Sequence, residues 1–138
     1  SPGSTSLSFK KDEDLPLLPA MYDLDDYSVF GAYVYPNMLI DLSPTVAVLT
    51  RYVPRSATHT TIYTYYLFPK EVVNNPEYDL EPTISFSDMV NQQDISVCVR
   101  VQRGVTSRSF TNAFHTNMER YCKQLIRRYR DEIQKGSN

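Results

Sequence analysis

The chain has 138 residues, which is the length of one ordinary domain. Its 14 Lys and Arg residues face 16 Asp and Glu residues, so the formal net charge is −2, which excludes a nucleic-acid binder that works through a positive surface. Hydrophobic residues make up 41% and charged residues 22% of the sequence, proportions typical of folded domains that exclude wholesale disorder.

The N-terminal segment, residues 1–28, is polar, acidic and interrupted by proline. It predicts an extended arm with at most one helical turn near Asp23–Tyr27. The segment has neither the basic region nor the apolar region of a signal peptide.

Three strands are predicted after the arm. Alternating hydrophobicity predicts the first over Phe30–Leu42, with a bulge or edge feature at Pro36-Asn37. The second and third are predicted over Val46–Val53 and Thr60–Phe68. Because the connections are short, the strands should form a three-stranded antiparallel meander. Both faces of the third strand are largely apolar or aromatic, with Ile62, Thr64, Tyr66 and Phe68 on one and Tyr63, Tyr65 and Leu67 on the other. We expect one face to meet helices and the other to line a cavity or contact a partner.

Two helices are predicted in the second half of the chain. A stripe at helical spacing predicts the first over Ile84–Arg103, ended by Gly104. The stripe consists of Phe86, Met89, Val90, Gln93, Asp94, Val97 and Val101. The capping box Thr116–Glu119 opens the second helix, and Gly136 follows as its stop. Its apolar face holds Met118, Tyr121, Cys122, Leu125, Ile126, Tyr129 and Ile133, and its basic face, Arg120, Lys123, Arg127, Arg128 and Arg130, is interpreted as solvated. The predicted fold class is α+β, an antiparallel sheet with a long C-terminal helix.

The cysteine content and hydropathy indicate the compartment. Cys98 and Cys122 both lie in predicted helices, and we expect them to be buried free thiols in a reducing environment. The longest apolar stretch, around Val46–Leu49, is far shorter than the roughly 20 residues of a membrane-spanning helix. These features predict a cytoplasmic protein that binds no membrane.

A self-contained active site is not apparent in the sequence. It has neither a glycine-rich phosphate loop nor a nucleophile-elbow motif. His59 is predicted in a turn and His115 in a connector, so neither a Cys–His nucleophile nor a zinc site is favoured.

Asp94 is the anomaly, because it falls on the apolar stripe of the first predicted helix. A carboxylate is costly to bury there unless it is paired or bound to a metal. From periodicity alone two explanations stay open. Asp94 is either structural, through a shifted helix register or an ion pair with Arg51 or Arg100, or it is a metal ligand.

Four segments resemble one enzyme family. Residues 91–108, NQQDISVCVRVQRGVTSR, resemble the C-terminal signature of the large (alpha) subunit of Rieske-type ring-hydroxylating oxygenases, which runs close to Q-D-x-x-V-C-E-x-V-Q-x-G-x-x-S. Residues 34–39 resemble the family's Tyr/Phe-Pro-Asn strand, and Leu15–Pro19 resemble the approach to it. Thr116–Glu119 resemble the start of its last helix. The matches occur in order along nearly the whole chain.

The resemblance implies a helix-grip (START-like) catalytic domain that holds one non-haem Fe(II) on two histidines and a carboxylate, leaving positions open for O₂. It implies that Asp94 is the carboxylate ligand. It also implies that Phe86, Val90 and Gln93 face the iron or the substrate cavity, and that Val29 and Gly31 border that pocket. Electrons would pass from NAD(P)H through a reductase or ferredoxin to a Rieske [2Fe–2S] cluster in a neighbouring subunit of a homotrimer.

The departures from the family pattern bear on activity. The cysteine–histidine motif of the Rieske cluster and the paired iron histidines are absent, Val99 stands where relatives often carry Glu, and Ala113 where many carry Gly. Two iron ligands and the electron entry would therefore lie outside this sequence. Residues 29–138 are interpreted as the C-terminal portion of the catalytic domain of a mono- or dioxygenase, which hydroxylates an aromatic ring or a small quaternary amine. We expect this chain to be inactive by itself.

The alternative from a different functional class is a non-catalytic binding module. A shortened helix-grip domain could use Tyr63, Tyr65 and Tyr66 to cradle an apolar ligand. Asp94 would then be a structural or ligand-pairing acid.

Overall fold

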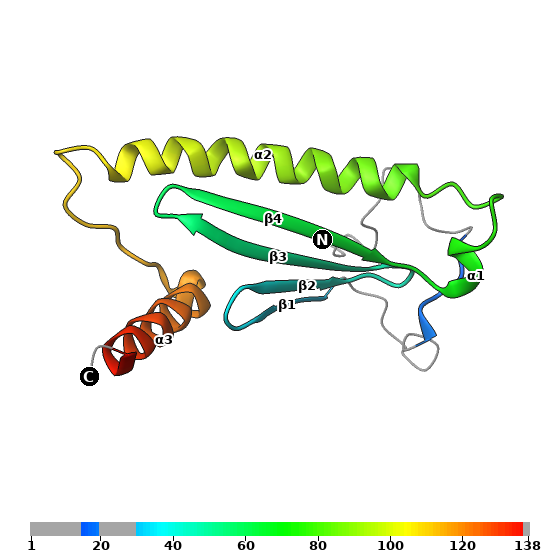
Figure 1. The fold of residues 1–138 in the computed structure, drawn as a ribbon, viewed down its shortest axis with the longest axis horizontal. Coiled ribbons are helices and arrows are strands. Elements are labelled where there is room, and N and C mark those ends of the chain that lie inside the picture. Colours follow the sequence, from blue (N-terminus) through cyan, green and yellow to red (C-terminus); the bar gives the residue numbers. More distant parts are fainter. Residues whose placement is uncertain (1–14, 20–29, 137–138) are drawn as a thin grey trace. The chain divides into compact units, whose positions relative to one another are not determined.

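The computed structural model describes residues 15–19 and 30–136 (Figure 1). Most of the predicted arm, its helical turn near Asp23–Tyr27, and Val29 lie outside these residues. The elements in chain order are β1 (Phe30–Val34), β2 (Met38–Leu42), β3 (Ala47–Ser56), β4 (His59–Leu67), α1 (Lys70–Val73), α2 (Glu81–Val105), the 3-10 helix η3 (Asn117–Glu119) and α3 (Arg120–Gly136). The chain divides into two compact units, residues 1–102 and residues 103–138. The α+β class predicted from the sequence is confirmed.

The first unit is built on a four-stranded antiparallel sheet in the order β1-β2-β3-β4. The predicted meander of three strands is therefore wrong, because Phe30–Leu42 is a hairpin of two strands joined at residues 35–37. The turn keeps the alternation of the two strands in phase, so the hydrophobic pattern crosses it without a break. Asn37 fixes this turn to the next strand, since its Nδ2 donates to the Tyr52 carbonyl oxygen at 2.7 Å. The Tyr52 amide in turn donates to the Asn37 carbonyl oxygen at 2.9 Å.

The register of the sheet decides which side chains share a face. Asp41 on β2 lies opposite Gly31 on β1 and Val48 on β3, and Leu39 lies opposite Thr50. Because side chains alternate along a strand, these residues and Tyr52 belong to one face of the sheet. Figure 1 shows α2 running along the sheet, and residues from its N-terminal half lie over this face.

The opposite face of the sheet carries exposed aromatic side chains. Tyr63 and Tyr65 on β4 are 41% and 50% exposed, whereas Tyr66 is half-buried. The alternation predicted for this strand is confirmed. The three tyrosines do not form one cradle, however, because Tyr66 points to the other side of the sheet from Tyr63 and Tyr65.

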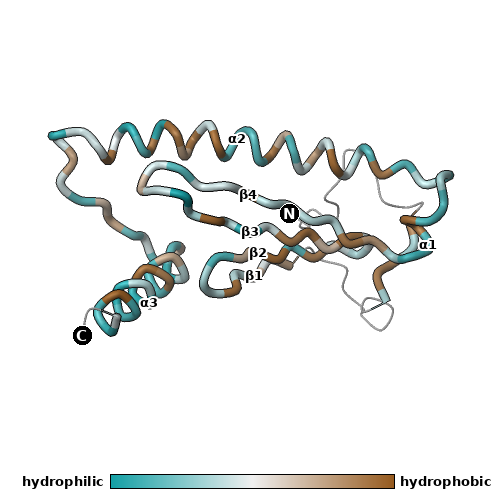
Figure 2. Tube along the Cα trace, viewed as in Figure 1, coloured by the Kyte–Doolittle hydropathy of each residue, from teal (hydrophilic) through white to brown (hydrophobic). Residues whose placement is uncertain are grey.

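The small core lies at the end of the sheet where β2 turns into β3. Its buried apolar side chains are Val46, Val48 and Val72. Ser43 is completely buried beside them, and its Oγ donates to the Val46 carbonyl oxygen at 3.2 Å. The Leu18 amide donates to the Pro44 carbonyl oxygen at 2.7 Å, which ties a described part of the N-terminal segment to this turn. Figure 2 shows hydrophobic stretches along the strands and alternating hydropathy along α2.

Both predicted long helices are present. The first, α2, begins three residues earlier than the predicted Ile84–Arg103 and ends one residue after Gly104. The second follows a capping box at Thr116, whose amide donates to Glu119 Oε2 at 2.7 Å, and it ends at Gly136 as predicted. None of the helices in the described part of the chain has both the length and the hydropathy of a membrane span.

The prediction that both cysteines are buried is wrong. Cys98 and Cys122 are free thiols, as expected, but both are exposed. Cys98 lies in the stretch of α2 from Gln92 to Val105, where the sheet covers no residue enough to bury it. In the second unit only Leu125 and Glu132 are even half-buried among residues 103–136, so the periodicity of a helix did not translate into burial.

Candidate functional site

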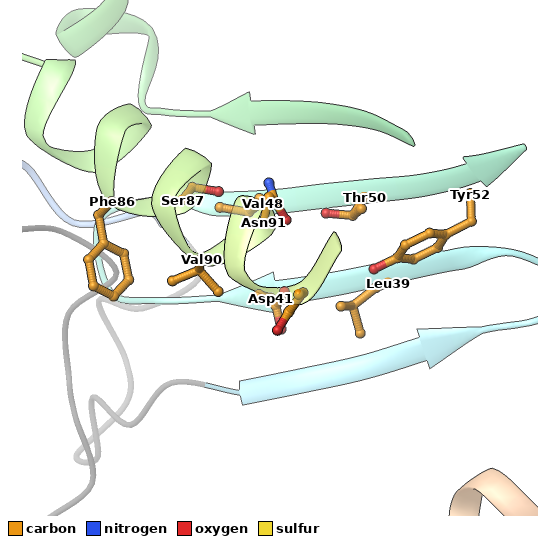
Figure 3. Close-up of a pocket in the computed structure, with 10 residues that line it drawn as sticks. Leu39, Asp41, Val48, Thr50, Tyr52, Phe86, Ser87, Val90 and Asn91 are labelled. Atoms are coloured by element: carbon orange, nitrogen blue, oxygen red, sulfur yellow. The ribbon is translucent and has the colours of Figure 1, made fainter. Parts of the chain in front are cut away.

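A cavity of about 130 Å³ lies between the sheet and the N-terminal half of α2 (Figure 3). Its lining residues are Leu39 and Asp41 from β2, Val48, Thr50 and Tyr52 from β3, and Phe86, Ser87, Val90, Asn91 and Asp94 from α2. Positions three or four apart share a face of a helix, and alternate positions share a face of a strand. The two periodicities therefore bring ten side chains to one place.

Two carboxylates line this cavity. Asp41 is half-buried, and burial raises its pKa above the ordinary value of 3.8. Asp94 is exposed on α2 while also lining the cavity. Among the described residues, none donates a hydrogen bond to either carboxylate or forms an ion pair with it. The expected burial of Asp94 is thus wrong, and so is the explanation by an ion pair with Arg51 or Arg100.

The charge of the cavity is negative. Burial raises the pKa of the Tyr52 hydroxyl first, and the nearby negative charges of Asp41, Asp94 and Cys98 raise it further. The described lining includes no Lys, Arg or His. Arg51 precedes Tyr52 on β3, and its partner in the strand register is Tyr63 on β4. Because side chains alternate along a strand, Arg51 lies on the opposite face of the sheet and does not neutralise the cavity.

Thr50 adds a polar side chain to the lining. The residue is only 5% exposed. Figure 3 shows Thr50 on the strand between Val48 and Tyr52, facing the same side as both.

Most of the residues predicted for the site can be located. Phe86, Val90 and Asp94 line the cavity together. Gln93 is exposed on α2 and does not belong to the lining, and Gly31 lies one strand away, opposite Asp41. Val29 lies outside the described residues. The residues that sequence reasoning missed are Leu39, Asp41, Val48, Thr50, Tyr52, Ser87 and Asn91. Asp41 carried a usable signal, because a lone carboxylate stood between Ile40 and Leu42 in a predicted strand.

The described residues do not supply a complete iron site. Nowhere in residues 15–19 and 30–136 do three His, Cys, Asp or Glu side chains gather so that they could hold a metal. His59 lies beside the β3–β4 turn, where its Nδ1 is 2.9 Å from Thr58 Oγ1, and His115 belongs to the second unit. The described residues that line the cavity offer carboxylates and hydroxyls but no imidazole. This donor set does not fit a site of two histidines and one carboxylate.

Comparison with known families identifies the class of protein. The family model described as "Ring hydroxylating alpha subunit (catalytic domain)" matches residues 2–135. The chain belongs to this family, so the resemblance carried by its motifs is confirmed. Members of the family are oxygenases that typically bind mononuclear iron and act with electron-transfer partners. No curated protein and no solved structure matches the chain.

Proposed function

We propose that this chain forms one wall of the active site of a ring-hydroxylating oxygenase. The cavity between the sheet and α2 holds the organic substrate, and Asp94 is the carboxylate ligand of the mononuclear iron. The observation that carries the proposal is that Asp94, the acid of the family signature, lines the cavity yet stays exposed. An exposed carboxylate without a described partner is free to bind a metal, and a cavity beside it can hold a substrate.

In this proposal, residues of this chain contact and orient the substrate. Apolar contacts come from Leu39, Val48, Phe86 and Val90, while Thr50 and Tyr52 orient polar groups. Gln93 is proposed to face the iron or the substrate cavity. Val29 and Gly31 are proposed to border the pocket, and Gly31 lies opposite Asp41 of the lining. Because no imidazole accompanies Asp94 in the described residues, the remaining iron ligands are proposed to come from outside them.

Family membership supports a wider assignment. We infer that the sheet and helices belong to a helix-grip catalytic domain of a cytoplasmic homotrimer. This enzyme hydroxylates an aromatic or small organic substrate, as a mono- or dioxygenase. Electrons reach it from NAD(P)H through a reductase or ferredoxin and a Rieske [2Fe–2S] cluster that this chain does not carry. The chain by itself is proposed to be inactive.

The test is iron retention in the intact oxygenase that contains this chain. Asp94→Ala should lose the mononuclear iron and with it NAD(P)H-coupled O₂ consumption. Asp88→Ala is the matched control, because Asp88 is an exposed carboxylate on α2 outside the cavity lining. The iron content of each purified variant is measured separately from turnover. An Asp94→Ala enzyme that keeps its iron would overturn the proposal.

A further inference from the structure

Tyr52 is held at both its backbone amide and its carbonyl by a single residue, Asn37. The Tyr52 amide donates to the Asn37 carbonyl oxygen at 2.9 Å, and Asn37 Nδ2 donates to the Tyr52 carbonyl oxygen at 2.7 Å. The first regular pair of β2 with β3 comes one residue later, between Met38 and Arg51. In a regular hydrogen-bonded pair both donors are backbone amides. The Asn37 side chain therefore takes the place of a backbone donor and extends the ladder by one residue, to Tyr52.

The turn that carries Asn37 is itself fixed to the sheet. The Tyr33 hydroxyl on β1 donates to the Pro36 carbonyl oxygen in this turn at 2.5 Å. Asn37 and Tyr52 are both half-buried, so water competes only in part for the bonds between them. The Tyr52 side chain therefore leaves β3 from a fixed point of the backbone.

Tyr52 and Phe86 lie at opposite ends of the cavity. Figure 3 shows the two rings at the two ends of the lining, with the Tyr52 hydroxyl directed inward toward Leu39. The spacing along α2 agrees with this view. Burial and then the charges of Asp41 and Asp94 raise the pKa of Tyr52, so Asp94 lies near its hydroxyl. Asp94 follows Phe86 by eight residues, about 12 Å along an α-helix.

The volume leaves room for one ring between these two ends. The cavity measures about 130 Å³, slightly less than the roughly 150 Å³ of an engineered protein cavity that binds benzene. A single six-membered ring therefore fills it. A second ring in line with the first requires Tyr52 to move out of the way.

We propose that Tyr52 determines specificity by limiting the length of the ligand, and that Asn37 is the positioning residue that holds Tyr52 in place. The inference rests on the proposed function, because it concerns the same cavity. It goes beyond that function by giving Asn37, which lies outside the lining, a part in substrate selection. The part depends on the side-chain amide, because without this donor only the Tyr52 amide still binds Asn37.

The test compares two uncharged probes that differ by one ring, phenol and 4-phenylphenol. In calorimetric titrations of the full chain, phenol should bind, and the second ring of 4-phenylphenol should add no affinity. Tyr52→Ala opens the end of the cavity and buries the second ring, so the affinity for 4-phenylphenol relative to phenol should rise about tenfold. Tyr65→Ala removes a tyrosine from the opposite face of the sheet and should leave the ratio unchanged.

Asn37→Asp tests the positioning role, because it keeps the size of the side chain and removes the donor. It should shift the ratio several-fold in the same direction as Tyr52→Ala. Added to Tyr52→Ala, it should shift the ratio no further, since a residue that acts through the Tyr52 ring has no effect once the ring is gone. A purely structural role would weaken both probes alike and leave the ratio unchanged. Asn112→Asp in the exposed connector is the control.

Two results would overturn separate parts of the inference. An unchanged ratio in Tyr52→Ala overturns the length limit. An unchanged ratio in Asn37→Asp, or a shift that persists when Tyr52 is already alanine, overturns the positioning role. If Asn37→Asp does not fold by circular dichroism, Asn37→Ser takes its place. Binding of neither probe overturns the inference as a whole, and iron retention by Asp94→Ala judges the oxygenase assignment independently.

Discussion

Gly31 lies directly opposite Asp41 in the β1–β2 ladder, and a methyl group at Gly31 would come 3.1 Å from Asp41 Oδ1. The missing side chain therefore makes room for the carboxylate that faces the cavity. A larger residue at this position must turn the Asp41 carboxylate or displace a strand.

Replacing Gly31 should reveal this contact. Gly31→Val is expected to move the Asp41 carboxylate and to destabilise the fold by about 1 kcal/mol, and Gly31→Ala should have a smaller effect. Urea denaturation measures the free energy of unfolding of each variant. Gly104→Ala is the control, since nothing lies within 4 Å of a side chain there and alanine favours the helix. Unchanged stability in Gly31→Val would contradict this contact.

The sequence predicted the helical half of this site better than the sheet half. The 3.6-residue period by itself places Phe86, Val90 and Asp94 on one face of the helix. Alternation along a strand shows only which residues share a face, and it does not show which face meets the helix. Asp41 and Thr50 were missed for that reason.

Two other predictions were wrong because a sequence pattern describes only one element at a time. The hairpin at residues 35–37 was hidden because its two strands stay in phase across the turn. Cys98 was expected to be buried because it lies on a helix with apolar stripes, yet burial depends on whether another element covers that stretch. The periodicity of a helix does not show which part of it packs against another element.

The Asn37 side chain should stabilise the β2–β3 pairing that carries Tyr52. Asn37→Asp replaces the amide donor with a group that accepts only, so the 2.7 Å bond to the Tyr52 carbonyl oxygen is lost. A loss of about 1 kcal/mol in the free energy of unfolding is expected. Urea denaturation checks it, with Asn112→Asp in the exposed connector as the control. Equal stability of the two variants would show that the side-chain bond contributes nothing.

The C-terminal helix should weaken in acid. Hydrogen bonding to Thr116, chiefly to its backbone amide, lowers the pKa of Glu119 below its ordinary value of 4.5. A lowered pKa means that the cap stabilises the helix above pH 4.5 and that this contribution is lost as the pH falls through the folded-state pKa. The amide proton shift of Thr116, followed by NMR, should titrate in that acidic range. In Glu119→Gln the amide oxygen can still accept the bond, so the helix start should persist and the titration should disappear.

Asp41 predicts the opposite pH dependence in the first unit. Burial raises its pKa above 3.8, so the folded chain holds this proton more tightly than the unfolded chain does. Its contribution to stability is complete below pH 3.8 and is lost as the pH rises through the raised folded-state pKa. Asp41→Asn keeps the shape without the charge and should therefore be more stable than the unaltered chain at neutral pH. The difference should shrink in acid, as measured by urea midpoints across the pH range. Asp88→Asn supplies the exposed comparison, and a stability gain of the same size there would assign the effect to overall charge instead of the cavity.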